Sequence, residues 1–130
     1  MRAIEAHARE TFPEECCGFL LGTATEPRKV AALRRATNVV ETNRERRYVI
    51  DPREHLAVEK ELVGTGREIL GFYHSHPNHP AEPSEFDRSH AWPWYSYLIL
   101  SIVDRVPKDL RAWSLEGTSA SFQPVPLEIA

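Results

Sequence analysis

Two histidines and an aspartate between residues 74 and 87 are the side chains best suited to bind a metal ion. His74 and His76 are separated by one residue at the end of an apolar run that starts at residue 69. In an extended strand such residues point to the same face, so both imidazoles could reach one ion. Catalytic zinc usually has three protein ligands and an open position for water. Asp87 is the best candidate for the third ligand.

The connection between these residues explains how Asp87 could return to the histidines. Three prolines lie between His76 and Ser84, and they stiffen the chain and favour a change of direction after the strand. We expect a helix from residue 85 to about residue 91, with Ser84 at or just before its start. The first turn of that helix would carry the Asp87 carboxylate back to the histidine face.

Each residue also has an ordinary structural role. A single strand histidine more often makes ordinary hydrogen bonds than binds a metal, and an aspartate near a helix start often interacts only with the helix. The spacing of Ser84 and Asp87 even imitates a helix-capping signal. Capping does not require two histidines on the preceding strand, however. The joint occurrence of these residues therefore favours a metal site.

The spacing resembles the signature of the JAMM (MPN-plus) metalloprotease family. The family pattern is His-x-His, seven residues, then Ser-x-x-Asp, and it is matched without a gap by His74, His76, Ser84 and Asp87. The family also has a glutamate just before a glycine-containing apolar run, which Glu15 before residues 16–22 resembles. Flanking likenesses extend the resemblance over nearly the whole chain; they lie at residues 47–52, 71–73 and 111–113.

The resemblance implies a division of roles among these residues. His74, His76 and Asp87 would bind one Zn²⁺ ion, which lowers the pKa of a bound water to near neutrality. Glu15 would be the general base that takes the proton of the water and passes it to the leaving amine. The Ser84 hydroxyl would help to stabilise the oxyanion, a contribution of about 3 kcal/mol.

Glu14 and Glu15 compete for the role of the base. Strand alternation places Glu15 on the face of Cys17 and Phe19, and Glu14 on the opposite face with Cys16. The family spacing selects Glu15, and we expect Glu14 to face solvent.

Other residues near the site match no family position. His79 and His90 are expected in loop and surface roles, although His79 could contact substrate. An aromatic patch follows the expected helix and consists of Trp92, Trp94, Tyr95 and Tyr97. We favour core or edge packing for this patch, and a groove for an extended substrate tail is the alternative.

Helices and strands are mixed along the chain. Helices are expected up to about Thr11, and from the cap Asp51 to Gly64 or Gly66, with Glu54 completing a capping box. The apolar stripe of the second helix consists of Leu56, Val58, Leu62 and Val63. Strands are expected at residues 16–22, 30–33, 47–50, 69–76, 97–103, 111–116 and 119–125, with turn signals at residues 107–109 and 116–117.

The fold class follows from this order of elements. Strict βαβ alternation is absent, which favours an α/β or α+β sheet covered by helices. The family resemblance implies the α/β, cytidine-deaminase-like JAMM/MPN fold, with a mixed, largely antiparallel curved sheet flanked by helices. The length of 130 residues predicts a single domain over residues 1–130.

Composition limits the compartment and the partners. No apolar run is long enough to cross a bilayer and the start lacks the core of a signal peptide, so we expect a cytoplasmic protein without a membrane partner. The net charge of -3 argues against a general affinity for nucleic acid. The adjacent Cys16 and Cys17 are expected to be reduced and buried.

A basic stretch has two interpretations. It contains Arg34, Arg35, Arg44, Arg46 and Arg47. A solvated loop or strand face is favoured, and a rim that receives an acidic protein tail is the alternative.

The complete motif predicts an active zinc metallopeptidase with isopeptidase-like activity. Resemblance to compact bacterial and archaeal members implies a ubiquitin-like or sulfur-carrier protein with a Gly-Gly tail as substrate, in cysteine or other sulfur-metabolite biosynthesis or in removal of a protein modifier. A non-catalytic interaction module and a hydrolase of small peptides or amino-acid conjugates are the alternatives. The sequence leaves open the carrier, the choice between peptide and isopeptide bond, and the oligomeric state.

Overall fold

The computed structural model describes residues 1–116 and 121–127. The described residues form three helices and six strands: α1 (Arg2–Thr11), β1 (Cys17–Thr23), β2 (Lys29–Ala36), α2 (Pro52–Leu62), β3 (Glu68–Pro77), α3 (Glu85–His90), β4 (Ser96–Val103), β5 (Val106–Glu116) and β6 (Ser121–Val125). These strands make one sheet in the order β2-β1-β3-β4-β5-β6. Among them, only β3 and β4 pair in parallel. The predicted mixed, largely antiparallel sheet is therefore confirmed.

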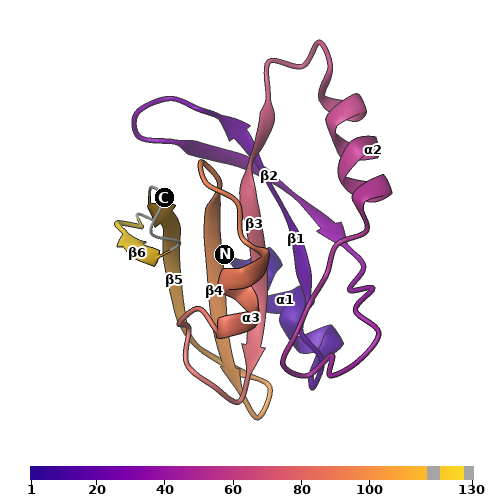
Figure 1. Ribbon diagram of the computed structural model, residues 1–130, viewed down its shortest axis with the longest axis vertical. Helices are drawn as coiled ribbons and strands as arrows, with labels where there is room; N and C mark the ends of the chain where they lie inside the picture. The colour runs from indigo at the N-terminus through magenta and orange to yellow at the C-terminus, as the bar shows by residue number, and fades with distance from the viewer. Residues whose placement is uncertain (117–120, 128–130) are drawn as a thin grey trace.

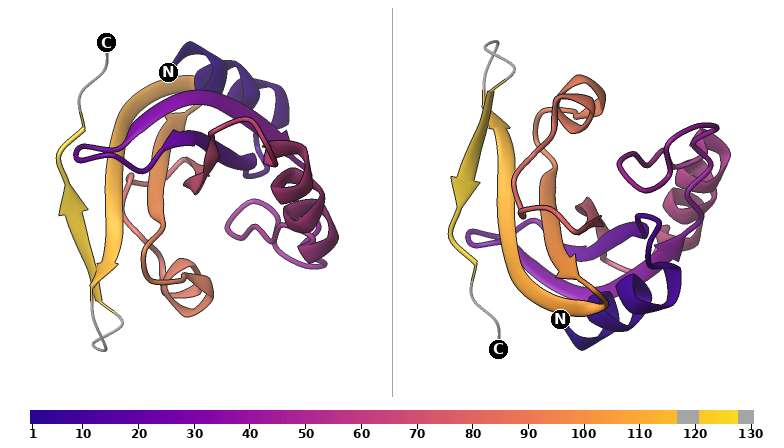
Figure 2. Two further views of the ribbon diagram at one scale, coloured as in Figure 1. Left: turned by 90° about the horizontal axis from the view of Figure 1, so that it is seen from above. Right: turned by 90° about the horizontal axis from the view of Figure 1, so that it is seen from below.

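The sheet is strongly curved, and helices lie on both of its sides (Figure 1). Viewed along the strands, α1 covers the convex side, whereas α2 and α3 lie on the concave side (Figure 2). Each side has its own buried core. On the convex side Ile4 and Ala8 of α1 pack with Tyr73 and Leu100, and on the concave side Val58 of α2 packs with other buried apolar residues.

A bulge in β3 determines which of its residues face the concave side. Leu20 of β1 pairs with Gly71, but the next residue, Leu21, pairs with Ile69. One extra residue in β3 therefore shifts the alternation of its side chains. As a result Ile69 and Phe72 both belong to the concave core. Regular alternation from Phe72 onward then brings the side chains at positions 74 and 76 to the same concave side.

No strand forms at residues 47–50, so the strand predicted there was wrong. Only Ile50 pairs in this segment, through an isolated bridge with Asn38. The Asn38 side chain replaces the missing ladder, because its Oδ1 accepts from the Val49 amide at 3.1 Å and its Nδ2 donates to the Arg47 carbonyl at 2.9 Å. A side chain can satisfy backbone groups in this way without forming a strand.

The predicted start of α2 is confirmed, but its capping box and its apolar stripe are not. Asp51 accepts from the Arg53 amide at 2.9 Å as the N-cap. Glu54 instead accepts from the Thr37 amide at 3.3 Å, which links α2 to the end of β2. The helix ends at Leu62, and Leu56 is 52% exposed. Val63, beyond the helix, is also exposed, so the predicted stripe was too wide.

The turn predicted at residues 107–109 was also misplaced. Those residues belong to β5, and the turn between β4 and β5 lies at Asp104 and Arg105, whose φ angles are 49° and 68°. Neither residue is glycine, the usual residue for positive φ. The predicted final strand and its turn reach into residues 117–120, outside the described residues; β6 is described from Ser121.

Among the described residues, none of the helices has the length and apolar character to cross a membrane.

Candidate metal and catalytic site

Four buried polar residues meet on the concave side of the sheet. Glu15, His74, His76 and Asp87 each offer a ligand atom, and these atoms lie within 4.8 Å of one another. All four side chains are buried. Glu15 precedes β1, the histidines belong to β3, and Asp87 lies in the first turn of α3. The structure thus brings together the expected ligands and the expected base from three segments of the chain.

Pairing between β1 and β3 places Glu15 beside the histidines. Cys17 lies opposite His74 in the register. Just before it, the Cys16 amide donates to Ser75 Oγ at 2.8 Å, and the Ser75 amide donates to the Cys16 carbonyl at 3.2 Å. Both cysteines are free and buried, as predicted.

The three candidate ligand atoms form a triangle whose sides are close to those expected around a tetrahedral zinc ion. The two Nε2 atoms of His74 and His76 are 3.1 Å apart, and Asp87 Oδ2 lies 3.2 Å and 3.0 Å from them. Ligand bonds of about 2.0–2.1 Å in a tetrahedron place neighbouring ligand atoms about 3.3 Å apart. The observed triangle is slightly tighter than this, and it fits a small divalent cation.

The hydrogen bonds around His76 indicate which atom faces this triangle as an acceptor. His76 Nδ1 lies 2.7 Å from the Pro80 carbonyl, which only accepts, so Nδ1 carries the proton. With Nδ1 protonated, the other ring nitrogen, Nε2, is the one that can bind a cation shared with His74 and Asp87. The chemistry of this donor set therefore suits a metal ion.

Glu15 and Asp87 are held in contrasting environments. Neither carboxylate oxygen of Glu15 has a hydrogen-bond partner among the described residues. Burial, with the nearby charge of Asp87 as a second cause, raises the pKa of Glu15 to about 10. Burial also opposes ionisation of Asp87, but the adjacent His74 and His76 hold the pKa of this carboxyl well below its usual range.

A tethered loop and a short helix return Asp87 to the sheet. The Ser101 hydroxyl of β4 donates to the His79 carbonyl at 2.7 Å, and the Trp113 indole of β5 donates to the Ala81 carbonyl at 3.0 Å. At the start of α3, Ser84 Oγ accepts from the Asp87 amide at 3.0 Å and Asp87 Oδ2 accepts from the Ser84 amide at 2.9 Å. The capping box and the candidate site thus use the same residues.

Two aromatic rings flank the histidines. Tyr48 stacks on His74 with ring centroids 4.4 Å apart, and His79 stacks on His76 at 4.2 Å. A loop or surface role was expected for His79, with substrate contact as the alternative, and the structure places it half-buried beside the site. No role was expected for Tyr48. It belongs to an irregular segment, so no periodic pattern marks its position.

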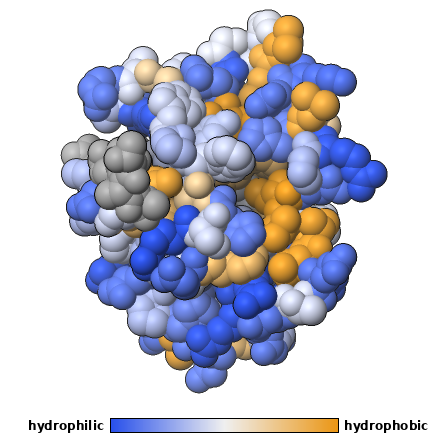
Figure 3. All heavy atoms as spheres, in the orientation of Figure 1, coloured by the Kyte–Doolittle hydropathy of each residue, from blue (hydrophilic) through white to orange (hydrophobic). Residues whose placement is uncertain are grey.

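A groove of about 180 Å³ lies on the concave side, and Tyr48 is part of its lining. Its lining consists of Tyr48, Val49, Ile50, His55, Phe72, His90, Trp92 and Tyr97. Both Tyr97 and Trp92 of the aromatic patch line this groove, but Tyr97 is buried in the concave core whereas Trp92 is 66% exposed. Figure 3 looks onto this side and shows apolar side chains gathered beside α3, toward α2.

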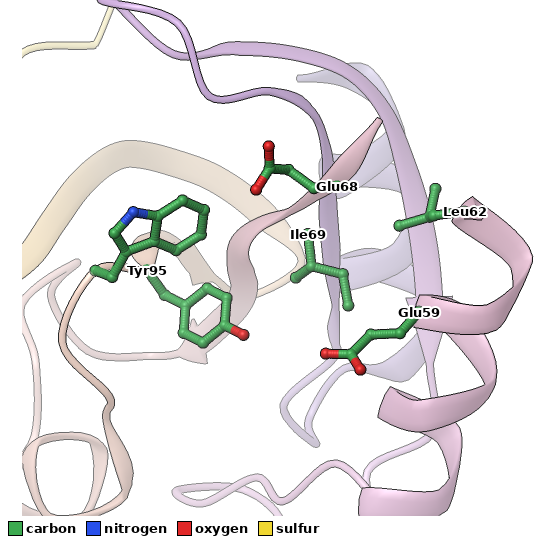
Figure 4. A pocket seen from close by; sticks show the side chains of 6 residues that line it. Glu59, Leu62, Glu68, Ile69 and Tyr95 are labelled. Atoms are coloured by element: carbon green, nitrogen blue, oxygen red, sulfur yellow. The ribbon is translucent and has the colours of Figure 1, made fainter. Parts of the chain in front are cut away.

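A second pocket of about 250 Å³ lies beyond this groove, between α2 and the start of β3 (Figure 4). Glu59 and Leu62 come from α2, Glu68 and Ile69 from β3, and Tyr95 closes the opposite side. The Tyr95 ring contacts both His55 and Phe72 of the groove. The groove and the pocket therefore adjoin on the concave side.

The remaining candidate residues lie where they were expected. Glu14 is exposed and Glu15 is buried, which agrees with the choice between them. His90 is exposed on α3 and stacks on Phe86 at 4.0 Å. Ser84 is half-buried at the helix start. Because its oxygen accepts from the Asp87 amide, its hydroxyl proton remains available for another acceptor.

Comparison with known proteins identifies relatives over most of the chain. The family described as prokaryotic homologs of the JAB domain matches residues 1–116. A desampylase of Haloferax volcanii is 39% identical over 104 residues, which cover 76% of this chain and 73% of the relative. A CysO-cysteine peptidase of Mycobacterium tuberculosis is 30% identical over 129 residues, which cover 96% of this chain and 84% of the relative.

A solved structure supports the fold. A JAB1/MPN-domain protein from Archaeoglobus fulgidus aligns with a TM-score of 0.61 at 19% identity, over 98% of this chain and 90% of the other.

Proposed function

This chain belongs to the family of prokaryotic homologs of the JAB domain, and from this premise we propose that it is a zinc-dependent metallopeptidase. Its substrate would be a ubiquitin-like or sulfur-carrier protein, cleaved at the peptide or isopeptide bond after a C-terminal Gly-Gly. The observation that carries the proposal is the buried triangle of two imidazoles and one carboxylate with a separate, unpartnered glutamate beside it.

The proposed ligands are His74, His76 and Asp87. Two imidazoles and one carboxylate are a frequent set in catalytic zinc sites. When bound, zinc is a Lewis acid that polarises a carbonyl and lowers the pKa of water. Ligand histidines usually donate their second nitrogen to a carbonyl or carboxylate, as His76 does with Pro80, which fixes the ring orientation.

Glu15 is proposed as the general base. It is not one of the three atoms of the triangle, yet it lies within reach of them. With a cation bound beside it, Glu15 would be ionised against the effect of burial, and its carboxylate would take the proton of the attacking water and deliver it to the leaving nitrogen. Its burial keeps bulk water from competing for this proton. An unpartnered buried carboxyl is costly for folding, so a purely structural role does not explain it.

Ser84 is proposed to stabilise the oxyanion. Its oxygen is held by the Asp87 amide, which fixes the hydroxyl at the edge of the site. The hydroxyl proton would donate to the carbonyl oxygen as negative charge develops there. Such a donor contributes more in the transition state than in the ground state, because the oxygen is then charged.

The groove supports the proposed tail. Its lining includes Tyr48, which stacks on His74, and several other aromatic side chains. Two consecutive glycines have no side chains to accommodate, so such a tail could lie extended along this groove. A relative that is named a CysO-cysteine peptidase agrees with a peptidase function.

Metal dependence and cleavage position together test this proposal. Ubiquitin extended by one alanine after its Gly-Gly tail is a suitable probe. We expect chelation to abolish release of alanine, stoichiometric zinc to restore it, and His76→Ala to lose both zinc and activity. Zinc-loaded protein that leaves the probe intact would instead favour a non-catalytic interaction module. Equal rates on a short Gly-Gly-Ala peptide and on the ubiquitin probe would favour a hydrolase of small peptides.

A further inference from the structure

Tyr48 belongs both to the proposed site and to the groove. Its ring stacks on the His74 imidazole, with centroids 4.4 Å apart and planes inclined by 26°, and it also lines the groove. Phe72, Trp92 and Tyr97 line the groove as well, but within residues 1–116 and 121–127 their rings stack on none of the proposed ligands. Tyr48 is therefore the point at which the groove meets the ligand triangle.

The backbone on both sides of Tyr48 is fixed by one side chain. Asn38 Nδ2 donates to the Arg47 carbonyl at 2.9 Å, and Asn38 Oδ1 accepts from the Val49 amide at 3.1 Å. The same Nδ2 also donates to the Glu15 carbonyl at 3.3 Å. Asn38 thus holds Tyr48 from either side and connects its segment to the residue proposed as the base.

The second imidazole of the triangle is covered in a similar way. His79 stacks on His76 with centroids 4.2 Å apart. Tyr48 and His79 are both half-buried, so each ring contacts its ligand and still has an exposed part. The space beside the triangle is therefore bounded by two stacked rings, and Tyr48 is the one on the side of the groove.

The last residue of a bound carrier tail comes next to Tyr48. Its carbonyl must come within reach of Glu15 and the ligand triangle for the proposed reaction. Any side chain on this residue starts at a Cβ about 2.5 Å from the carbonyl carbon. Because the tail approaches from the groove, this Cβ would start beside the ring that stacks on His74. Glycine places no Cβ there.

We propose that Tyr48 restricts the last residue of the carrier tail to glycine and so determines specificity at the cleaved bond. This proposal rests on the proposed peptidase function. An added methyl group has to displace the Tyr48 ring, and the stack on His74 and the hydrogen bonds of Asn38 resist that displacement. In an extended tail the preceding side chain points to the opposite side. Tyr48 therefore selects at the last residue and not at the one before it.

The test compares ubiquitin–alanine probes that differ by one methyl group in the tail. The tail ends in Gly-Gly or in Gly-Ala before the cleaved bond. We expect zinc-loaded protein to cleave the Gly-Gly probe with a kcat/KM about 10–100-fold above that of the Gly-Ala probe. Tyr48→Ala should bring this ratio close to one. Tyr48→Leu, which keeps an apolar side chain against His74, should lower it in part, and Tyr48→Phe should keep it.

Three controls separate selection from general damage to the site. Trp92→Ala removes another ring of the groove, so it should change kcat/KM for both probes alike and keep their ratio. A probe with Ala-Gly before the cleaved bond should give the same rate relative to Gly-Gly in Tyr48→Ala as in the unmodified protein. Zinc content is measured for every variant, and rates are compared between zinc-loaded proteins.

A binding measurement gives the same comparison without cleavage. Ubiquitin ending in Gly-Gly and ubiquitin ending in Gly-Ala, both without the extra alanine, are titrated into each variant by calorimetry. We expect the Gly-Gly end to bind more tightly to the unmodified protein and to Tyr48→Phe, and the difference to disappear in Tyr48→Ala.

The outcomes separate this proposal from the function on which it rests. Equal cleavage of the Gly-Gly and Gly-Ala probes by the unmodified protein, or an undiminished ratio in Tyr48→Ala and Tyr48→Leu, overturns the role of Tyr48 and leaves the peptidase intact. A ratio close to one in Tyr48→Phe also overturns it, because the hydroxyl and not the ring would then select. Failure of zinc-loaded protein to cleave any probe overturns the peptidase, and the binding comparison alone then decides whether Tyr48 selects glycine.

Discussion

At the scale of single residues, Asp87 has two tasks that depend on one oxygen. Its Oδ2 accepts from the Ser84 amide and also lies against His74 and His76. The helix cap therefore orients the carboxylate that is proposed to bind zinc. Outer contacts of this kind orient metal ligands and are part of a metal site.

Ser84→Ala is expected to lower kcat by about 10²–10³-fold if the hydroxyl stabilises the oxyanion. The substitution also removes a helix cap, at a cost of about 1 kcal/mol. Zinc content should therefore be measured with kcat. Ser84→Thr keeps the hydroxyl and should restore part of the rate. Ser89→Ala, which removes another hydroxyl from α3, is the control. A normal kcat in zinc-loaded Ser84→Ala would contradict the assignment.

Sequence reasoning could identify Glu15 but not Tyr48. Two local signals separate Glu15 from Glu14: strand alternation, and the spacing to the glycine-containing run at residues 16–22. Both extend over only a few residues, so both can be seen in the sequence. Tyr48 stacks on His74 across a long sequence separation. Its segment has no strand period, since the Asn38 side chain replaces the ladder there. A local pattern contains no information on such a contact.

At the scale of elements, the loop between β3 and α3 depends on tethers from β4 and β5. Ser101→Ala removes the hydrogen bond to the His79 carbonyl while leaving the shape of the buried site almost unchanged. We expect about 1 kcal/mol of lost stability and a zinc affinity about tenfold weaker. Competition with a fluorescent chelator measures this affinity.

Ser96→Ala provides the matched control on the same strand. Ser96 Oγ accepts from Arg28 at 3.1 Å, at the end of β4 away from the Ser101 tether. Its removal should leave zinc affinity unchanged. If both variants bind zinc as tightly as the unmodified protein, the tether at Ser101 does not position the site.

Most elements could be predicted because their signals are local. The proline-rich loop, the cap at Ser84 and the apolar run of β3 are each visible within a short window of sequence. The turn at Asp104 and Arg105 was missed because pairing of β4 with β5 imposes positive φ on residues that rarely adopt it. The bulge in β3 likewise follows from pairing with β1.

At the scale of the whole molecule, packing on the convex side of the sheet holds β3, the strand that carries both proposed histidine ligands. Phe72 belongs to the concave core and the next residue, Tyr73, belongs to the convex core, so His74 again points to the concave side. His7 of α1 is buried, and its Nδ1 lies 2.8 Å from the Tyr73 hydroxyl. This contact fastens α1 to the strand that carries the proposed ligands.

The buried His7 predicts a pH dependence of stability. Burial, with the charge of Arg35 as a second cause, lowers the pKa of His7 below its usual value of 6.5, and Glu10 opposes this only in part. At a pH between the lowered pKa and 6.5, His7 is therefore neutral in the folded protein but protonated in the unfolded chain. The resulting stability is fully present above pH 6.5 and is lost as the pH falls from there toward the folded pKa.

Replacement of His7 by asparagine tests this dependence. His7→Asn keeps a polar group for Tyr73 but does not titrate. The difference in unfolding free energy between the unmodified protein and the variant should shrink as the pH falls from about 7.5 to about 5. Urea denaturation at several pH values measures it. Because the proposed metal ligands are present in both proteins, their titration cancels in the difference. A difference that stays constant with pH would contradict the prediction.

The central claim is that three buried residues bind zinc while a fourth, Glu15, performs the proton transfer. Native mass spectrometry of the protein mixed with the ubiquitin–alanine probe reads the metal content and the cleavage of the probe in one spectrum. We expect the unmodified protein to carry one zinc ion and to shorten the probe to its Gly-Gly end. Glu15→Gln should carry the same zinc ion and leave the probe intact, and Glu14→Gln should behave as the unmodified protein. Cleavage by Glu15→Gln at the unmodified rate, or an intact probe beside zinc-loaded unmodified protein, would contradict the account.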